Sequence, residues 1–263
     1  MQIDLAGRTA LVTGSTQGIG LAIARRLAQA GATVWINGRT QERVDGAVEQ
    51  LRAELPGADL QGVAADVATA DGAQAVFDAL PAVDVLVNNL GIFAAADVFE
   101  VEDDEWDRFW QTNVVSGIRL TRHYAPLMRT AGWGRVLFIA SESSVAIPVE
   151  MVHYGVTKTA QLGVARGYAK ALAGSGVTVN SVIAGPTHTE GVEEFVHGLV
   201  GAKPWPEAEA EFMRDHRPNS IIQRLIEPVE IANLVTYLSS EFASATTGGA
   251  IRVDGGIADH ILP

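Results

Sequence analysis

A glycine-rich turn between an apolar run and a helical pattern constrains the fold of this chain more than any other stretch. Residues 9–13 form the apolar run, residues 14–20 read Gly-Ser-Thr-Gln-Gly-Ile-Gly, and a helical pattern continues to Ala30. Gly31 ends that helix, and residues 32–37 read as a second strand. Strand, turn, helix and strand within about 30 residues make a βαβ unit.

The same alternation continues along the chain. We expect further helices at 40–55, 70–80, 104–132 and 151–174, and further strands at 60–65, 83–88, 134–141, 177–182 and 250–253. Strands that are nearly continuous apolar runs, separated by helices, indicate a parallel sheet covered on both faces. The sequence therefore predicts one α/β domain over residues 1–263, with a doubly wound sheet of seven parallel strands.

A proline-punctuated stretch at about residues 186–226 breaks this alternation. It contains a weak helical run at 190–200, then Pro204, Trp205 and Pro206, and a charged run that ends at Arg217. A long insertion of this kind is usually a lid or a binding loop, and a surface excursion is the alternative. We expect a substrate lid here, with Trp205 as a candidate substrate contact.

Composition limits the partners. The 263 residues include no cysteine, which excludes disulfides, zinc–thiolate sites and a thiol nucleophile. A net charge of −12 argues against nucleic acid and anionic membrane as partners, and no signal peptide or membrane-spanning run is evident. The sequence also lacks the Gly-x-Ser-x-Gly and His-Glu-x-x-His motifs of serine and zinc hydrolases. We expect a cytoplasmic protein without a metal site that acts on a small molecule.

The glycine turn has the context of a phosphate-binding loop. Its glycines permit close approach of the backbone to a pyrophosphate, and the following helix offers N–H donors and the positive end of its dipole. We therefore predict that a dinucleotide binds to Gly14, Ser15, Thr16, Gln17, Gly18, Ile19 and Gly20. The spacing differs from the general Gly-x-Gly-x-x-Gly fingerprint, so an ordinary strand-to-helix turn is the alternative.

The end of the second predicted strand indicates which dinucleotide is bound. Where a carboxylate would hold a free ribose 2′-hydroxyl, the chain reads Asn37, Gly38, Arg39, Thr40. Arg39 can pair with a 2′-phosphate through charge-assisted hydrogen bonds. The sequence predicts NADP(H) over NAD(H), and a solvated arginine at a helix start is the alternative.

Tyr154 and Lys158 lie four residues apart in a predicted helix and so share one of its faces. A nearby ammonium favours the ionised phenol and lowers the tyrosine pKa from its usual value of about 10. This pair predicts a tyrosine tuned for proton transfer. A solvated pair on an exposed helix face is the alternative.

These features together resemble the short-chain dehydrogenase/reductase family over essentially the whole chain. Further landmarks stand in the family's order: Asp66 and Val67, Asn88 to Gly91, Asn113, Ser141, Asn180, Gly185 to Thr187, and Val253 to Gly256. The resemblance implies a Rossmann-like fold and hydride transfer between a nicotinamide and a carbonyl or secondary alcohol. It also implies a homotetramer, for which the small residues Ala160, Gly163 and Gly167 offer a close-packing face, with interior packing as the alternative.

The resemblance implies a catalytic tetrad. Tyr154 would donate the proton, Ser141 would hydrogen-bond the same oxygen, Lys158 would lower the tyrosine pKa and bind the nicotinamide ribose, and Asn113 would hold a water. Further cofactor contacts would be Arg39, Asp66, Val67, Asn89, Gly91, Pro186, Thr187 and Thr189. Ser143 and His153 are candidate substrate contacts, with a packed or solvated histidine as the alternative for His153. Phe93, Val145, Ile147, Val149, Trp205 and Phe212 are candidates for an apolar substrate wall.

Two positions depart from the family pattern. Leu90 replaces an alanine, which bears on how closely that turn packs against the cofactor, and Ala184-Gly185-Pro186 stands where the family has Pro-Gly. The predicted function is an NADP(H)-dependent carbonyl reductase or alcohol dehydrogenase. A 3-oxoacyl-thioester reductase, and a non-catalytic dinucleotide-binding sensor, are the alternatives.

Overall fold

One parallel sheet of seven strands forms the centre of the protein. The computed structural model describes residues 2–261. The strands are β1 (Thr9–Val12), β2 (Thr33–Gly38), β3 (Leu60–Ala64), β4 (Val85–Asn88), β5 (Gly134–Ser141), β6 (Val177–Ala184) and β7 (Ala250–Val253). Their spatial order is β3-β2-β1-β4-β5-β6-β7, with all pairs parallel. The predicted doubly wound sheet of seven parallel strands is confirmed.

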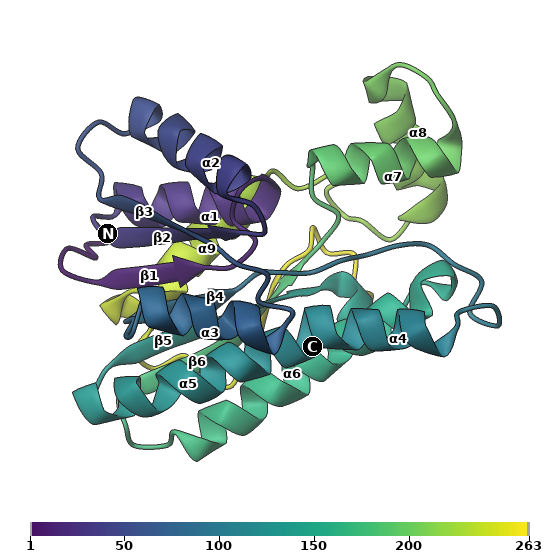
Figure 1. Ribbon diagram of the computed structural model, residues 1–263. Coiled ribbons are helices and arrows are strands. Elements are labelled where there is room, and N and C mark those ends of the chain that lie inside the picture. The colour runs from purple at the N-terminus through teal and green to yellow at the C-terminus, as the bar shows by residue number, and fades with distance from the viewer. Residues whose placement is uncertain (1, 262–263) are drawn as a thin grey trace.

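Helices cover both faces of this sheet (Figure 1). On one face, α1 (Gly18–Gln29), α2 (Gln41–Glu54) and α9 (Pro228–Leu238) bury apolar residues against the strands. On the other face, α3 (Ala70–Ala79), α5 (Ser116–Ala131) and α6 (Val152–Ala171) form a second apolar core. The inner strands β1, β4, β5 and β6 are therefore buried from both sides, which explains why they read as continuous apolar runs.

The strand order reverses at β1, which pairs with β2 on one side and with β4 on the other. The two crossovers that leave β1 and β4 lie on opposite faces of the sheet, so a crevice opens at the carboxyl ends of these strands. Ligands of open α/β sheets bind in this crevice. The last residues of β1, β4, β5 and β6 are consequently the places where functional side chains converge.

The helical stretch predicted at 104–132 is present, but it is not a regular α-helix throughout. The structure has α4 (Asp103–Trp110), a π-helical turn at Gln111–Val115, and then α5. A π turn widens the helix by one residue per hydrogen-bonded ring and is frequent at functional sites. Here the π turn carries Asn113, whose side chain forms hydrogen bonds with the main chain of Ile92.

Two helices near the carboxyl end were not anticipated by the sequence pattern. Helix α8 (Trp205–His216) begins with Trp205 and Pro206, and α9 begins with Pro228 behind a capping box between Glu227 and Glu230. Proline in a first helical turn sacrifices no hydrogen bond, because that N–H has no partner within the helix. Pro204 and Pro206, two of the prolines that suggested an irregular insertion, therefore belong to a helix start. Short 3-10 turns lie at Glu142–Ser144, Val149–Met151 and Glu241–Ala243.

The segment between β6 and α9 stands apart from the two helical layers (Figure 1). Its helices α7 (Glu190–Val200) and α8 pack on each other through a small core of their own: Val196, Ala208, Phe212, Met213 and Leu225. Main-chain hydrogen bonds close its base, with the Ile226 N–H donating to Pro186 at 2.8 Å and the His188 N–H donating to Ile226 at 2.9 Å. We call residues 186–226 the lid segment.

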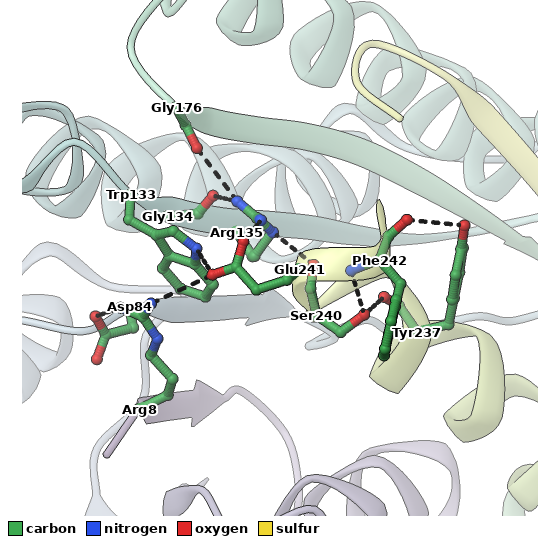
Figure 2. A network of polar contacts seen from close by, with 10 residues as sticks. All are labelled: Arg8, Asp84, Trp133, Gly134, Arg135, Gly176, Tyr237, Ser240, Glu241 and Phe242. Atoms are coloured by element: carbon green, nitrogen blue, oxygen red, sulfur yellow. Dashed lines mark hydrogen bonds and ion pairs between the residues drawn. The ribbon is translucent and has the colours of Figure 1, made fainter. Parts of the chain in front are cut away.

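A buried arginine ties the carboxyl-terminal part of the chain to the amino end of the sheet (Figure 2). Arg135, only 1 % exposed, donates hydrogen bonds to the carbonyls of Gly134, Gly176 and Ser240. Arg135 and Arg8 both place their guanidinium over the Trp133 ring, at 4.3 and 3.7 Å from its centre. The Trp133 indole N–H in turn donates to Glu241 at 2.6 Å.

Replacing Arg135 with methionine is expected to lower the free energy of unfolding by about 2 kcal/mol, since it leaves buried carbonyls without donors. Denaturant unfolding measures this loss. The matched variant Arg8→Met removes a half-exposed guanidinium and is expected to cost less than about 1 kcal/mol. Because Arg135 lies at the opposite end of β5 from Ser141, kcat per folded molecule should not change. Equal stability losses in the two variants would contradict this assignment.

Candidate active site

Two adjoining cavities lie at the carboxyl ends of the strands. The first, of about 410 Å³, extends from the glycine turn to Arg39 and Asp66. The second, of about 270 Å³, lies between the glycine turn, β5, α6 and the lid segment. Gln17, Asn89 and Gly91 line both cavities, so the two spaces are continuous. We refer to them as the nucleotide cavity and the reaction cleft.

The glycine turn is held open by contacts between β1 and β2. The Ser15 N–H donates to the Asn37 carbonyl at 2.9 Å, and the Asn37 N–H donates to the Ser15 hydroxyl at 3.0 Å. The Asn37 amide donates to Val63 and Ala65, both at 3.1 Å. That Asn37 and Ser15 anchor the glycine turn through these hydrogen bonds was not predicted from the sequence.

The start of α1 fits a pyrophosphate. Gln17 precedes this helix without capping it, the first turn contains no acidic residue, and Gly18, Ile19 and Gly20 line the reaction cleft. By contrast, Thr40 caps α2 with its side chain. Gly18 has φ +55°, and a Cβ there would lie 3.2 Å from Thr189, so the turn requires glycine at that position. The N–H groups at the start of α1, the positive end of its dipole and the close approach that glycine permits match the phosphate groups of a dinucleotide.

The far end of the nucleotide cavity carries positive charge. Arg39, Thr40 and Arg43 line it, and neither arginine forms an ion pair with another residue of the described range 2–261. Asp66 and Val67 line the same cavity, with the Asp66 carboxylate accepting from the Ala68 N–H at 3.1 Å. These residues fit an adenosine bearing a 2′-phosphate.

The turn after β4 is fixed by Thr13. The Thr13 hydroxyl accepts from the N–H groups of Asn89 and Leu90, both at 3.0 Å, and the Asn89 amide donates to the carbonyls of Thr13 and Gly14 at 2.9 and 3.0 Å. The Leu90 side chain lines the nucleotide cavity and packs against the second apolar core. A Cβ on Gly91 would approach the Lys158 ammonium to 3.2 Å.

Three of the four predicted tetrad residues line the reaction cleft. Ser141 ends β5, while Tyr154 and Lys158 project from the first turns of α6. Asn113 is buried behind them, where its side chain accepts from the Ile92 N–H at 2.8 Å and donates to the Ile92 carbonyl and the Thr157 hydroxyl at 3.0 and 2.9 Å. Its geometry supports a role in holding the Gly91–Ile92 loop, which follows β4, beside Lys158. The water-holding role stays a prediction.

The predicted effect of Lys158 on Tyr154 is wrong for this structure. The Lys158 ammonium donates to the Ile139 carbonyl at 2.8 Å and lies 5.7 Å from the Tyr154 ring centre. Burial raises the pKa of Tyr154 above its usual value, with Glu142 adding to the rise and Ser141 and Arg217 opposing it. Burial also lowers the pKa of Lys158 to about 8, partly offset by Glu142. Desolvation, which the sequence spacing does not report, outweighs the attraction.

Lys158→Met is expected to stabilise the protein at neutral pH by about 2 kcal/mol while it removes activity, because a pKa unit corresponds to about 1.4 kcal/mol and one hydrogen bond is lost. The Lys158 pKa falls from 10.5 in the unfolded chain to about 8, so its burial cost is complete below pH 8. Between pH 8 and 10.5 the folded protein releases the proton first, and the wild-type stability rises relative to the variant.

Urea unfolding at pH 7 and pH 9.5 measures this change. Lys170→Met removes an exposed lysine from the same helix and serves as the control. A stability difference between wild type and Lys158→Met that is the same at both pH values would contradict the assignment.

The sequence analysis missed two charged residues of the reaction cleft, Glu142 and Arg217. Both are buried, at 6 % and 9 % exposed, and the Arg217 Nε lies 3.6 Å from the Glu142 carboxylate. Glu142 follows Ser141 directly, and the Ser141 hydroxyl donates to it at 2.6 Å. Arg217 comes from the end of the charged run, and nothing in that run distinguished it from its solvated neighbours.

Several of the predicted cofactor and substrate contacts line the reaction cleft, and others lie outside it. Ser143, Pro186, Thr187, Thr189, Phe93 and Phe212 line the cleft. His153 and Trp205 do not belong to its lining, so their assignment as substrate contacts is corrected. His153 is 1 % exposed and packs 4.3 Å from the Phe109 ring centre, and Trp205 stacks on His188 at 5.1 Å within the lid segment. Val145, Ile147 and Val149 likewise lie outside the lining.

Comparison with known proteins gives a family match and the same architecture. The family described as "Enoyl-(Acyl carrier protein) reductase" matches residues 14–258. The chain is 50 % identical to "Uncharacterized oxidoreductase YvaG" of Bacillus subtilis (strain 168), over 100 % of both chains. It is 34 % identical to "Dehydrogenase/reductase SDR family member 4" of Caenorhabditis elegans, over 95 % of each.

A solved structure is similar over nearly its whole length. L-Sorbose reductase from Gluconobacter frateurii, complexed with NADPH and L-sorbose, superposes with a TM-score of 0.92 at 30 % identity. The match covers 99 % of this chain and 100 % of that one. Together with the tetrad, the uncapped glycine turn and the seven-stranded sheet, these similarities establish that the chain belongs to the short-chain dehydrogenase/reductase family.

Proposed function

We propose that Tyr154 is the general acid and base of this oxidoreductase, with Ser141 and Lys158 as its partners in the reaction cleft. The enzyme acts on carbonyl or secondary alcohol groups, and the bound nicotinamide supplies or accepts the hydride. The observation that carries the residue assignment is the convergence of Ser141, Tyr154 and Lys158 on one cleft that opens into the nucleotide cavity.

The raised pKa of Tyr154 suits the reductive direction. A phenol that remains protonated at neutral pH can donate its proton to an oxygen that becomes negative during reduction. The Ser141 hydroxyl, at the end of β5, is placed to donate to the same oxygen. Lys158 carries its proton at neutral pH and can hold ribose hydroxyls, with Asn113 positioning the adjoining main chain.

The cofactor is NADP(H). Arg39 and Arg43 line the distal end of the nucleotide cavity, and this fits a 2′-phosphate better than a free hydroxyl. The similar structure from Gluconobacter frateurii contains NADPH. Pro186, Thr187 and Thr189 enclose the nicotinamide end of the site from the lid segment. The substrate is a small molecule, and the lid segment closes over it.

Consumption of NADPH over a panel of ketones tests the function. We expect turnover of ketones and oxidation of the corresponding secondary alcohols with NADP⁺. Preferred turnover of an acetoacetyl thioester would favour the 3-oxoacyl-thioester alternative. NADPH binding without consumption across the panel would favour a non-catalytic sensor.

A homotetramer stays part of the proposal. Gly163 and Gly167 lie exposed on α6, and a Cβ at either would meet nothing within 4 Å, so this face is open for close contact with another copy. Light scattering after gel filtration tests the assembly. None of the helices in residues 2–261 is long and apolar enough to cross a membrane. The cytoplasmic location stays a prediction, which cell fractionation would test.

A further inference from the structure

We infer that Glu142 and Arg217 select substrates in which a hydroxyl group stands on the carbon next to the reacting carbonyl. This inference rests on the proposed function and adds the substrate class. The two residues come from β5's end and from the lid segment, and both line the reaction cleft beside Ser141 and Tyr154.

The first observation concerns the proton of Ser141. Its hydroxyl donates to the Glu142 carboxylate at 2.6 Å and accepts from the Ser143 N–H at 3.2 Å. Ser141 must release that proton from Glu142 before it can donate it to a substrate carbonyl. A substrate hydroxyl can replace Ser141 as the hydrogen-bond donor to the Glu142 carboxylate. The Ser141 hydroxyl is then free to donate to the substrate carbonyl. The hydroxyl must therefore lie close to the carbonyl.

The second observation concerns Arg217. Its Nη1 donates to the His216 carbonyl at 2.7 Å, but its buried Nε has no hydrogen-bond partner within residues 2–261. This Nε lies 3.6 Å from Glu142, too far for a good hydrogen bond. A buried donor without an acceptor is costly. An oxygen atom placed between Arg217 and Glu142 satisfies it.

A hydroxyl group on the substrate meets both requirements. It accepts from Arg217 through its oxygen and donates to Glu142 through its hydrogen, whereas an alkyl group does neither. A carboxylate accepts but cannot donate. Glu150 also lies 3.7 Å from Arg217, so two carboxylates surround one guanidinium and oppose a further negative charge. The site therefore disfavours 2-oxo acids.

Aromatic rings of the same cleft accept an apolar substituent. Phe93 packs edge-on against Tyr154 with 6.3 Å between ring centres, and Phe195 lies edge-on to Phe93 at 5.9 Å. All three rings line the cleft. The favoured substrate is thus an uncharged 2-hydroxy ketone with a hydroxylated end toward Glu142 and Arg217 and an alkyl end toward Phe93. Its reduction product is a 1,2-diol.

Three ketones that share an ethyl group test the inference: 1-hydroxy-2-butanone, its isostere 3-pentanone, and 2-oxobutanoate. We expect kcat/KM with NADPH to be about 100-fold higher for the hydroxy ketone than for 3-pentanone, since two hydrogen bonds to charged groups are at stake. The oxo acid should be the poorest of the three. Calorimetric binding to the NADP⁺-loaded enzyme, where reduction cannot occur, should give the same order of Kd.

Glu142→Gln and Arg217→Gln should each reduce the preference for the hydroxy ketone over 3-pentanone to about tenfold or less, in both kcat/KM and Kd. The ratio is informative because loss of folded protein affects both ketones equally. Glu211→Gln makes the same chemical change as Glu142→Gln on the outer side of α8, where Glu211 pairs with Lys203 at 2.6 Å. This control should keep the wild-type preference.

Each outcome decides between the two proposals. Equal kcat/KM for the hydroxy ketone and 3-pentanone, or an unchanged preference in both Gln variants, overturns the inference and leaves the proposed function standing. Preference for 2-oxobutanoate overturns it in favour of an anionic substrate. Failure to reduce any ketone, with NADPH still bound, overturns the proposed function and the inference with it.

Discussion

Replacing Tyr154 with phenylalanine is expected to lower kcat by about 10³-fold, the loss that accompanies removal of a positioned general acid. The substitution removes one oxygen atom from a side chain that lines the reaction cleft, and the ring can keep its edge-on contact with Phe93. Ser141 and Lys158 remain, but neither takes over the proton transfer: Ser141 is bonded to Glu142 and Lys158 to the Ile139 carbonyl.

Steady-state consumption of NADPH with a ketone measures this effect, and fluorescence titration shows whether NADPH binding is retained. Tyr168→Phe is the matched control, because Tyr168 lies on the same helix and its hydroxyl donates only to the Ile118 carbonyl at 3.3 Å. That variant should keep nearly full activity. If Tyr154→Phe turned over substrate at a rate close to the wild type, another group would have to supply the proton.

Replacing Arg39 with serine is expected to lower kcat/KM for NADPH by about 50-fold, because hydrogen bonds to a charged group contribute about 1.5–3 kcal/mol and each 1.4 kcal/mol is tenfold. The value for NADH should change little, since it has no 2′-phosphate to lose. Arg39→Asp should go further and favour NADH, because a carboxylate repels the phosphate and accepts from the ribose hydroxyls.

The ratio of kcat/KM for NADPH and NADH is the measurement. Arg129→Ser removes an exposed arginine from the last turn of α5 and should leave the ratio unchanged. Arg43 lines the same end of the nucleotide cavity, so Arg43→Ser should produce a smaller loss in the same direction. A wild-type enzyme that prefers NADH, or an Arg39→Ser variant with unchanged preference, would refute the assignment.

Local patterns in the sequence were sufficient for much of the fold. The order of strands and helices followed from apolar runs and helical periodicity, which each segment carries within itself. The glycine turn followed from its place between β1 and α1, and the positions of Ser141, Tyr154 and Lys158 followed from the family's motifs. Ser141 lies at the end of β5, and Tyr154 and Lys158 lie in the first two turns of α6, so the connectivity of the sheet is enough to bring them together.

Other features depend on contacts between distant segments. The π turn at Gln111–Val115 accompanies the hydrogen bonds of Asn113 to Ile92 and Thr157, and helix α8 depends on a core shared with α7. A window of sequence contains only one side of each of these contacts. Helical periodicity across 104–132 therefore predicted a regular helix without the π turn. The prolines at 204 and 206 were read as signs of an irregular segment, so helix α8 was not predicted.

The sequence by itself determined which chemical groups are present and on which elements they lie, because periodicity and motif spacing are local properties of the chain. Only the tertiary structure decided their electrostatic state. Burial in the cleft reversed the expected direction of the Tyr154 pKa, and the fold brought Arg217 to Glu142 although the two residues lie far apart in the sequence. Solvation and charge pairing are set by everything that surrounds a group, and those surroundings exist only once the chain has folded.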